Sequence, residues 1–203
     1  METLRLFIAI ELDDAMRRAL KRAQTQLQDD KQNGLVAQKI VRWVAPQNIH
    51  LTLRFLGNSN SAQVSSLTRV LAQIAQHTAP FTLTARGLGC FPNARRPNNV
   101  WVGLEGDVPR AALLARQIDD ACATLGFARE ERGFTPHLTL GRVKREASNA
   151  QRTALGECIK NIPAETYGTI SARAVCLISS DLKPQGPIYT MLAECAFGEA
   201  TTK

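Results

Sequence analysis

The chain has 203 residues, carries a net charge of +7 at pH 7 and has a pI near 9.5. That length allows one large domain, or two small lobes, with a sizeable core. Hydrophobic residues make up 44% of the chain and charged residues 21%, the ordinary balance of a soluble globular protein. The positive charge favours an anionic partner, most commonly nucleic acid, although an inert basic surface would carry the same charge.

The cysteines and the N-terminal apolar run exclude several classes of protein. The five cysteines are odd in number and none lie close together in sequence: Cys90, Cys122, Cys158, Cys176 and Cys195. This pattern argues against a disulfide framework or a zinc site, and favours buried thiols in a reducing compartment. The apolar run over 6–10 is too short for a signal-peptide core or a membrane span. We therefore predict a cytoplasmic protein with no membrane association, bound metal or cofactor.

The first half of the chain alternates between strand and helix patterns. The predicted elements are a strand over 4–12, a helix over 14–28, a polar loop over 29–34, a short strand over 41–44, a strand over 48–57 and a helix over 61–77. Asp13 and Ser61 are suitable N-caps for the two helices, because their side-chain oxygens accept hydrogen bonds from free amides of the first turn.

The second half repeats this alternation and ends in strands. The predicted elements are a strand over 81–88, a loop over 90–99, a strand through Trp101, a helix from Pro109 to Leu125, an irregular stretch over 129–132, a strand over 134–142, a helix over 148–160, strands over 169–179 and 188–197, and a frayed tail over 198–203. The loop is too rich in proline and asparagine for regular structure, and Gly126 ends the long helix.

One four-residue phrase, His-Leu-Thr-Leu, occurs twice, at 50–53 and at 137–140, 87 positions apart (137 − 50). Both copies alternate polar and apolar residues, which predicts strands with one buried face. Because successive side chains of a strand point to opposite faces, each His shares a face with the Thr two positions later. The leucines, and Phe55 after the first copy, are expected on the buried face. We predict that each copy is anchored by its leucines and presents an imidazole and a hydroxyl on its free side.

Two imidazoles on two strands are sufficient for acid–base catalysis without a metal. The chain has only three histidines, and the phrases contain two of them, His50 and His137. Imidazole titrates near pH 6.5, so one ring can accept a proton while the other donates one. Hydroxyls of Thr52 and Thr139 are suited to hold anionic oxygens between the rings. This set of groups is typical of phosphoryl chemistry. The third histidine, His77, has no Thr partner and is assigned no catalytic role.

The chain resembles the two-histidine (2H) phosphoesterases, and among them the RNA 2′,3′-cyclic phosphodiesterases, also called 2′-5′ RNA ligases. The resemblance covers most of the chain: the opening 5–10, both His-x-Thr phrases, the stretch 100–104 and the segment 182–189. It implies an α+β fold of two pseudo-twofold-related lobes of mainly antiparallel sheet backed by helices, with the active site in the cleft between them. We expect a single bilobal domain over 1–203, acting as a monomer.

The resemblance also implies roles for the site residues. His137 would activate water, and His50 would protonate the 3′-oxygen of an RNA 2′,3′-cyclic phosphate to leave a 2′-phosphate. Thr52 and Thr139 would hold the non-bridging oxygens. The near symmetry of the site leaves the opposite assignment of acid and base open. The reverse reaction would join a 5′-hydroxyl to the cyclic phosphate without ATP.

Arg142 matches a family position that supports phosphate binding. Strict alternation would place it on the leucine face, so the strand must end or bulge before it. Arg54 has the parity to lie beside Thr52, although a solvent-exposed strand arginine is its simpler interpretation. Phe7 matches a family position typical of core packing, and Tyr189 one typical of packing or ligand contact.

Three other functions remain open from the sequence. A non-catalytic RNA-binding module agrees with the basic charge, but aromatic residues make up only 5% of the chain, few for stacking on bases. A sister activity on another cyclic phosphate or on 2′-5′ oligonucleotides would use the same histidines. A purely structural duplicated fold would require the His-Thr pairs to be buried against each other.

Overall fold

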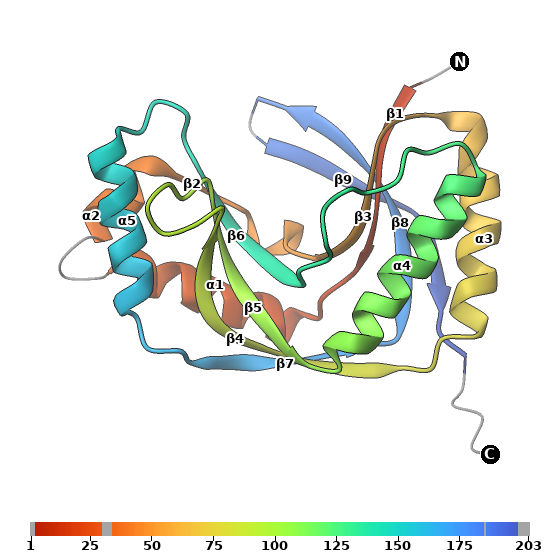
Figure 1. Ribbon diagram of the computed structural model, residues 1–203, viewed down its shortest axis with the longest axis horizontal. Coiled ribbons are helices and arrows are strands. Elements are labelled where there is room, and N and C mark those ends of the chain that lie inside the picture. Colours follow the sequence, from red (N-terminus) through yellow and green to blue (C-terminus); the bar gives the residue numbers. More distant parts are fainter. Residues whose placement is uncertain (1–2, 30–33, 185, 199–203) are drawn as a thin grey trace.

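The computed structural model describes residues 3–29, 34–184 and 186–198 of the chain. It contains two antiparallel sheets (Figure 1). The first sheet has the strand order β3 (Leu51–Asn60), β1 (Thr3–Ile10), β8 (Ala174–Lys183), β9 (Gly186–Ala196). The second has the order β2 (Val41–Trp43), β6 (His137–Val143), β5 (Asn99–Gly106), β4 (Phe81–Phe91), β7 (Thr166–Ala172). The predicted α+β class with two helix-backed sheets is confirmed.

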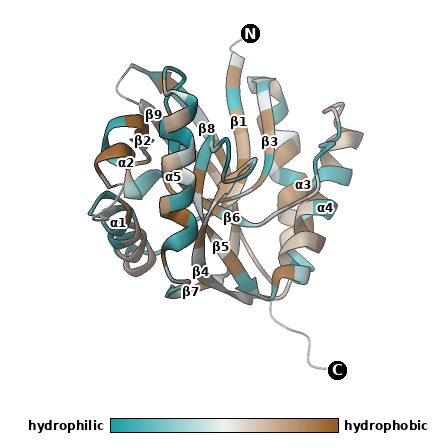
Figure 2. Cartoon of the chain, turned by 60° about the vertical axis from the view of Figure 1, so that its left-hand side comes forward, coloured by the Kyte–Doolittle hydropathy of each residue, from teal (hydrophilic) through white to brown (hydrophobic). Residues whose placement is uncertain are grey.

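Each sheet is backed by its own helices, which lie on opposite sides of the molecule in Figure 1. Helix α3 (Val64–Gln76) packs on β8 and β9, and α4 (Val108–Thr124) packs on β3 and on α3. For the second sheet, α1 (Asp14–Gln28) packs on β7, α5 (Asn149–Asn161) packs on β4, and α2 (Gly34–Ile40) contacts both of these helices. Figure 2 shows hydrophilic and hydrophobic residues side by side on α5, as expected for a helix with one face against a sheet.

Local capping explains where several helices begin. The Asp13 carboxylate accepts a hydrogen bond from the amide of Met16 at 2.7 Å, so the predicted N-cap of α1 is confirmed. Ser148 and Gln151 form a capping box at the start of α5. The predicted N-cap of α3, Ser61, is wrong: Asn60 caps a preceding 3₁₀ turn, and Gln63 occupies the N-cap position of α3 without a side-chain cap. A short 3₁₀ turn, Ser61–Gln63, separates Asn60 from α3.

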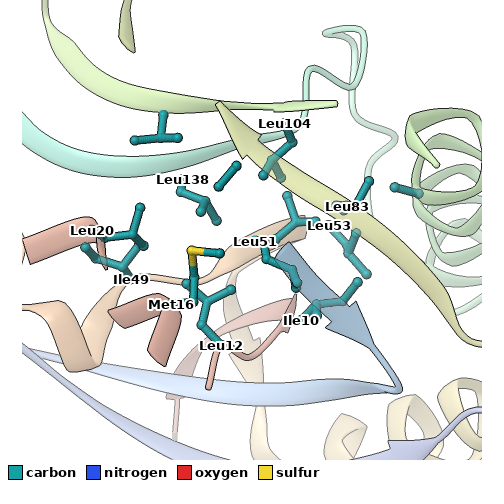
Figure 3. Close-up of a cluster of buried hydrophobic side chains, with 14 of the residues drawn as sticks. Ile10, Leu12, Met16, Leu20, Ile49, Leu51, Leu53, Leu83, Leu104 and Leu138 are labelled. Atoms are coloured by element: carbon teal, nitrogen blue, oxygen red, sulfur yellow. The ribbon is translucent and has the colours of Figure 1, made fainter. Parts of the chain in front are cut away.

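Both sheets contribute to one contiguous hydrophobic core. Figure 3 shows side chains from both sheets and from α1 gathered in it: Leu51 and Leu53 of β3, Leu138 of β6, Leu104 of β5, and Met16 and Leu20 of α1. The opposite face of the first sheet carries a smaller apolar cluster of Phe7, Ala9, Cys176 and Ile178, with Tyr189 packed against it. The leucines of the two repeated phrases therefore pack in the core that both sheets share. The smaller cluster lies on the other face of β1 and β8.

Three predictions about elements are wrong. Helix α2, starting at Gly34 inside the predicted polar loop, was not expected, because only two further buried residues, Ala37 and Ile40, mark its inner face. Strand β4 continues through Phe91, where the ladder with β5 extends into the predicted loop. The single strand predicted over 169–179 is two strands, β7 and β8, which break at Arg173 because they belong to different sheets.

The predicted frayed tail is described only at its first residue. The amide of Gly198 donates a hydrogen bond to the carbonyl of Ala75 at 2.9 Å. The rest of that prediction, over 199–203, lies outside the described residues, as does most of the predicted loop, at 30–33.

Candidate active site

The two repeated phrases begin or nearly begin a strand in each sheet. His50 directly precedes β3, the edge strand of the first sheet, and His137 is the first residue of β6 in the second. The leucines of both phrases are at most 6% exposed, and burying one fully contributes roughly 1.5–3 kcal/mol. Thr52 and Thr139 lie on the opposite face of their strands and line one cleft of about 970 Å³. The predicted parity of these two phrases is confirmed.

A bulge places Arg142 beside Thr139. In the ladder of β5 and β6, Trp101 pairs with Thr139 and Val100 pairs with Gly141, so Leu140 has no partner. This extra residue interrupts the alternation, and Arg142 lines the same cleft as Thr139. The predicted break before Arg142 is therefore confirmed.

A second bulge changes the positions after Thr52. Ile8 pairs with Arg54 and Ala9 pairs with Thr52, which leaves Leu53 unpaired. The side chain of Phe55 is 49% exposed and lines the cleft, so its predicted place on the buried face is wrong. The interrupted alternation explains this outcome.

Aromatic rings enclose His50. Its ring stacks on Phe7 with centroids 4.6 Å apart and planes at 24°, and meets the edge of Tyr189 at 5.4 Å. Burial lowers the pKa of His50 to about 4, because the charged ring loses its hydration. The charges of Arg142 and His137 lower this pKa further. His50 itself is not among the residues that line the cleft.

The ring of His50 has a weak polar contact with the backbone of Asn48. The backbone of Asn48 lies close enough to raise the pKa of the ring, against the larger effect of burial. The buried Nδ1 atom nevertheless makes no hydrogen bond of good geometry. Asn48 is also fixed from the other side, because its side-chain amide donates to the carbonyl of Pro187 at 3.0 Å. The start of β9, which carries Tyr189, is thereby held close to His50.

The surroundings of His137 are more open and more polar. Its Nδ1 lies 2.7 Å from the carbonyl oxygen of Thr135, which can only accept a hydrogen bond. Nδ1 therefore carries a proton, and the lone pair of the neutral ring is on Nε2. Partial burial lowers the pKa of His137, and the Thr135 carbonyl opposes this by favouring the protonated ring. Phe91 places its edge against the ring, with centroids 4.9 Å apart.

Arg54 is buried, so its interpretation as a solvent-exposed strand residue is wrong. Its side chain is 6% exposed and forms ion pairs with Asp119 of α4 at 2.9 Å and with Glu130 at 3.6 Å. It also donates a hydrogen bond to the carbonyl of Ala128. Arg54 thereby ties the strand of the first phrase to the segment that leads into the second phrase.

Sequence reasoning did not find several residues that line the cleft. Phe91, Asn98 and Asn99 belong to the predicted loop over 90–99, and Phe134 precedes the second phrase. The one feature of the sequence that could have indicated these residues was their position next to the ends of predicted strands. His77 caps the C-terminal end of α3, with Nδ1 2.9 Å from the carbonyl of Gln73, and does not line the cleft.

Within 3–29, 34–184 and 186–198, no three His, Cys, Asp or Glu side chains are grouped so that they could hold a metal ion. No helix in this part of the chain combines the length and the apolar composition needed to cross a bilayer.

Comparison with known proteins identifies the family. The model of the LigT-like phosphoesterases matches residues 10–102 and again 102–189, one repeated phrase in each match. RNA 2′,3′-cyclic phosphodiesterase of Methanothermobacter thermautotrophicus is 34% identical over 187 residues, 92% of this chain and 95% of that protein. The protein of the same name from Aquifex aeolicus is 33% identical over 158 residues, 77% of this chain and 82% of its own.

Solved structures agree with the sequence matches. A crystal structure of a Thermus thermophilus protein superposes with a TM-score of 0.77 at 27% identity and covers 97% of this chain and 99% of its own. Escherichia coli LigT in complex with 3′-AMP gives a TM-score of 0.74 at 25% identity, with the same coverage of both chains. With the family model matched twice and the whole fold shared, the chain belongs to the LigT-like phosphoesterases of the 2H superfamily.

Proposed function

We propose that the protein hydrolyses 2′,3′-cyclic phosphates at RNA 3′ ends to 2′-phosphomonoesters. The observation that carries this proposal is the placement of the two His-x-Thr phrases. They come from different sheets, and Thr52, Thr139 and His137 line one cleft. The relatives named RNA 2′,3′-cyclic phosphodiesterase support the same reaction. The complexes of Escherichia coli LigT with 3′-AMP and with phosphate support a site that accepts a phosphate group.

The tautomer of His137 supports its role as the base. Its Nδ1–H is held by Thr135, so Nε2 is free to take a proton from water. The water oxygen forms a bond to phosphorus while the bond from phosphorus to the 3′-oxygen breaks. The 3′-oxygen needs a proton as it leaves, and His50 supplies it.

The low pKa of His50 gives this step a condition. In the free protein its ring is neutral at pH 7, because its pKa is about 4. A bound phosphate brings negative charge next to the ring, and an opposite charge nearby raises the pKa of a histidine. Protonation of His50 therefore accompanies binding of the substrate. Thr52 and Thr139 donate hydrogen bonds to the non-bridging oxygens, and Arg142 adds positive charge.

Ligation uses the same groups. A 5′-hydroxyl takes the place of water, gives its proton to the base, attacks the cyclic phosphate and displaces the 3′-oxygen, which leaves a 2′-5′ linkage without ATP. Hydrolysis and ligation are both proposed to run without a metal ion. We also propose that the protein acts as a monomer in the cytoplasm, since one chain supplies both phrases and its five cysteines are free thiols.

A defined RNA with a 2′,3′-cyclic phosphate end tests the proposal. The expected product carries a 2′-phosphate, and the rate is unchanged by EDTA. A 3′-phosphate product would contradict the assignment of the leaving oxygen, and loss of activity on chelation would contradict the metal-independent scheme. Tight binding of the RNA without turnover would favour an RNA-binding module. Turnover restricted to other cyclic phosphates or to 2′-5′ oligonucleotides would favour a sister activity.

A further inference from the structure

Asn98 is held in place where three strands end, at the margin of the cleft. Its backbone amide donates to the carbonyl of Phe91 at 2.6 Å, and its carbonyl accepts from the amide of Val143 at 2.8 Å. Asn98 is among the residues that line the cleft, as is the neighbouring Arg142. The backbone of Asn98 is therefore fixed by the ends of β4 and β6.

Arg152 of α5 fixes the orientation of the Asn98 side chain. The guanidinium of Arg152 donates to the side-chain oxygen of Asn98 at 2.9 Å and to the carbonyl of Pro97 at 2.8 Å. A guanidinium has only donors, so the amide atom that faces it must be the oxygen, and the NH₂ group must point elsewhere. Arg152 does not line the cleft, whereas Asn98 does. The amide oxygen is therefore directed to Arg152, and the NH₂ group, on the other branch of the amide, is free of this contact.

The loop that carries Asn98 is docked firmly on α5. At Gly156 an added Cβ atom would lie 1.8 Å from the carbonyl oxygen of Ala94, so only glycine permits this approach of helix and loop. Arg152 makes further hydrogen bonds to the carbonyls of Ala147 and Lys144. This rigid support fits a group that must hold its donors in place before a ligand arrives.

The charges around Asn98 favour an anion. Arg142 forms no ion pair among the described residues, so its charge is available to a ligand. The carboxylates that line the cleft, Asp119 and Glu130, are paired with arginines instead. The side of the cleft at Asn98 and Arg142 thus offers hydrogen-bond donors and positive charge.

The position of Asn98 along the strand separates it from the reacting phosphate. Trp101 pairs with Thr139, and Asn98 lies three residues before Trp101. At a rise of about 3.3 Å per residue, Asn98 is roughly 10 Å along the strand from the level of Thr139. A ligand group bound at Asn98 is therefore a different group from the reacting phosphate and lies next to it along the substrate. Because a 2′,3′-cyclic phosphate ends its strand, the neighbouring phosphate lies on the 5′ side of the terminal nucleotide.

We propose that the NH₂ group of Asn98, oriented by Arg152, binds the phosphate on the 5′ side of the terminal nucleotide. This inference rests on the proposed function and extends it from the reacting bond to the preceding phosphate. It makes the protein selective for strands, or for 5′-phosphorylated nucleotides, over nucleoside 2′,3′-cyclic phosphates with a free 5′-hydroxyl.

The test compares two substrates that differ only at the 5′ position: a nucleoside 2′,3′-cyclic phosphate with a 5′-hydroxyl and the same nucleoside with a 5′-phosphate. The wild-type protein is expected to have the higher kcat/KM on the 5′-phosphorylated substrate. Asn98→Asp keeps the oxygen that Arg152 binds and replaces the NH₂ donors by a charged acceptor. It should lower kcat/KM on the 5′-phosphorylated substrate by about tenfold or more, the scale of one hydrogen bond to a charged group. The loss should be mainly in KM, since the contact is remote from the reacting atoms.

Asn93→Asp is the matched control. Asn93 lies in the same loop but does not line the cleft, and its side-chain oxygen accepts from the amides of Arg95 and Arg96. The variant adds the same charge and should leave the 5′-phosphate preference intact. Equal losses of Asn98→Asp on both substrates, or a wild-type protein indifferent to the 5′-phosphate, would overturn the inference alone. Absence of turnover on both substrates and on a cyclic-ended RNA would overturn the proposed function itself.

Discussion

The two His-Leu-Thr-Leu phrases have the same sequence but different surroundings. His50 packs against the rings of Phe7 and Tyr189, and burial lowers its pKa to about 4. His137 lies at the cleft with its Nδ1–H held by the Thr135 carbonyl, and its pKa is lowered without a comparable enclosure. The phrase itself fixes the buried leucines and the free threonine. The neighbours from other strands decide how each imidazole titrates, which is consistent with the proposed division of acid and base roles between the two phrases.

The largest expected effect is the loss of either imidazole. His50→Ala and His137→Ala should each lower the rate on a cyclic-ended RNA by roughly 10²–10⁴, the usual contribution of a general acid or base. His77→Ala is the control and should retain full activity, because His77 lies at the end of α3 outside the cleft. Near-normal turnover of either catalytic variant would contradict the two-histidine scheme.

Removal of the hydroxyls tests whether the phrases act symmetrically at the phosphate. Thr52→Val and Thr139→Val keep the side-chain shape and should each lower kcat by up to about 10²–10³, the cost of losing one donor to a developing charge. Single-turnover kinetics on the cyclic-ended RNA measures the effect. If only one of the two variants is impaired, one phrase alone holds the phosphate, which would contradict equivalent roles of the two threonines.

Acid titration separates the two histidines through stability. The unfolded chain binds a proton on His50 near pH 6.5, whereas the folded chain does so only near pH 4. Between these values the unfolded state holds more protons, so the free energy of unfolding falls as the pH is lowered, by roughly 3 kcal/mol in total. Urea unfolding of the wild-type protein across pH 4–7 should show this loss of stability. In His50→Asn most of the pH-dependent loss should disappear. His137→Asn should reduce it less. Equal effects of the two variants would contradict the difference in burial.

The smallest expected effect concerns the ring that covers His50. Phe7→Leu removes the stacked face at the cost of a modest core loss, and better hydration of His50 should raise its pKa toward 6.5. An NMR titration of the imidazole signals measures the shift. Phe81→Leu is a matched control, because Phe81 is also buried and stacks on Phe197 rather than on a histidine. An unchanged pKa of His50 in Phe7→Leu would show that stacking is not its main source of enclosure.

Much of the fold was predictable where patterns are long or local. The alternation of the two phrases placed the leucines in the core, and the cap at Asp13 fixed the start of α1. The break before Arg142 was predictable because a polar family position fell on the apolar face. Short or interrupted patterns were not predictable. Helix α2 has too few turns to show a period, and nothing local marks the bulge at Leu53 that exposes Phe55.

The remaining features depend on partners that are distant in sequence. Arg54 has the pattern of an ordinary strand arginine and is buried only because Asp119 of α4 and Glu130 meet it in space. The orientation of Asn98 depends on Arg152, 54 positions later in the chain. The ring contacts of His50 come from Phe7 and from Tyr189 of β9, which are far apart in the chain. Such pairings follow from the strand order of the sheets, which periodicity alone does not supply.

The central claim is that the two imidazoles serve one phosphate. It is tested most directly by titrating the protein with a nucleoside 2′-monophosphate, the proposed product, while the imidazole resonances of all three histidines are followed by NMR. We expect the resonances of His50 and His137 to shift with one common dissociation constant and the pKa values of these two rings to rise, while the resonances of His77 do not shift. A response of only one of the two rings, or separate dissociation constants for them, would contradict the account.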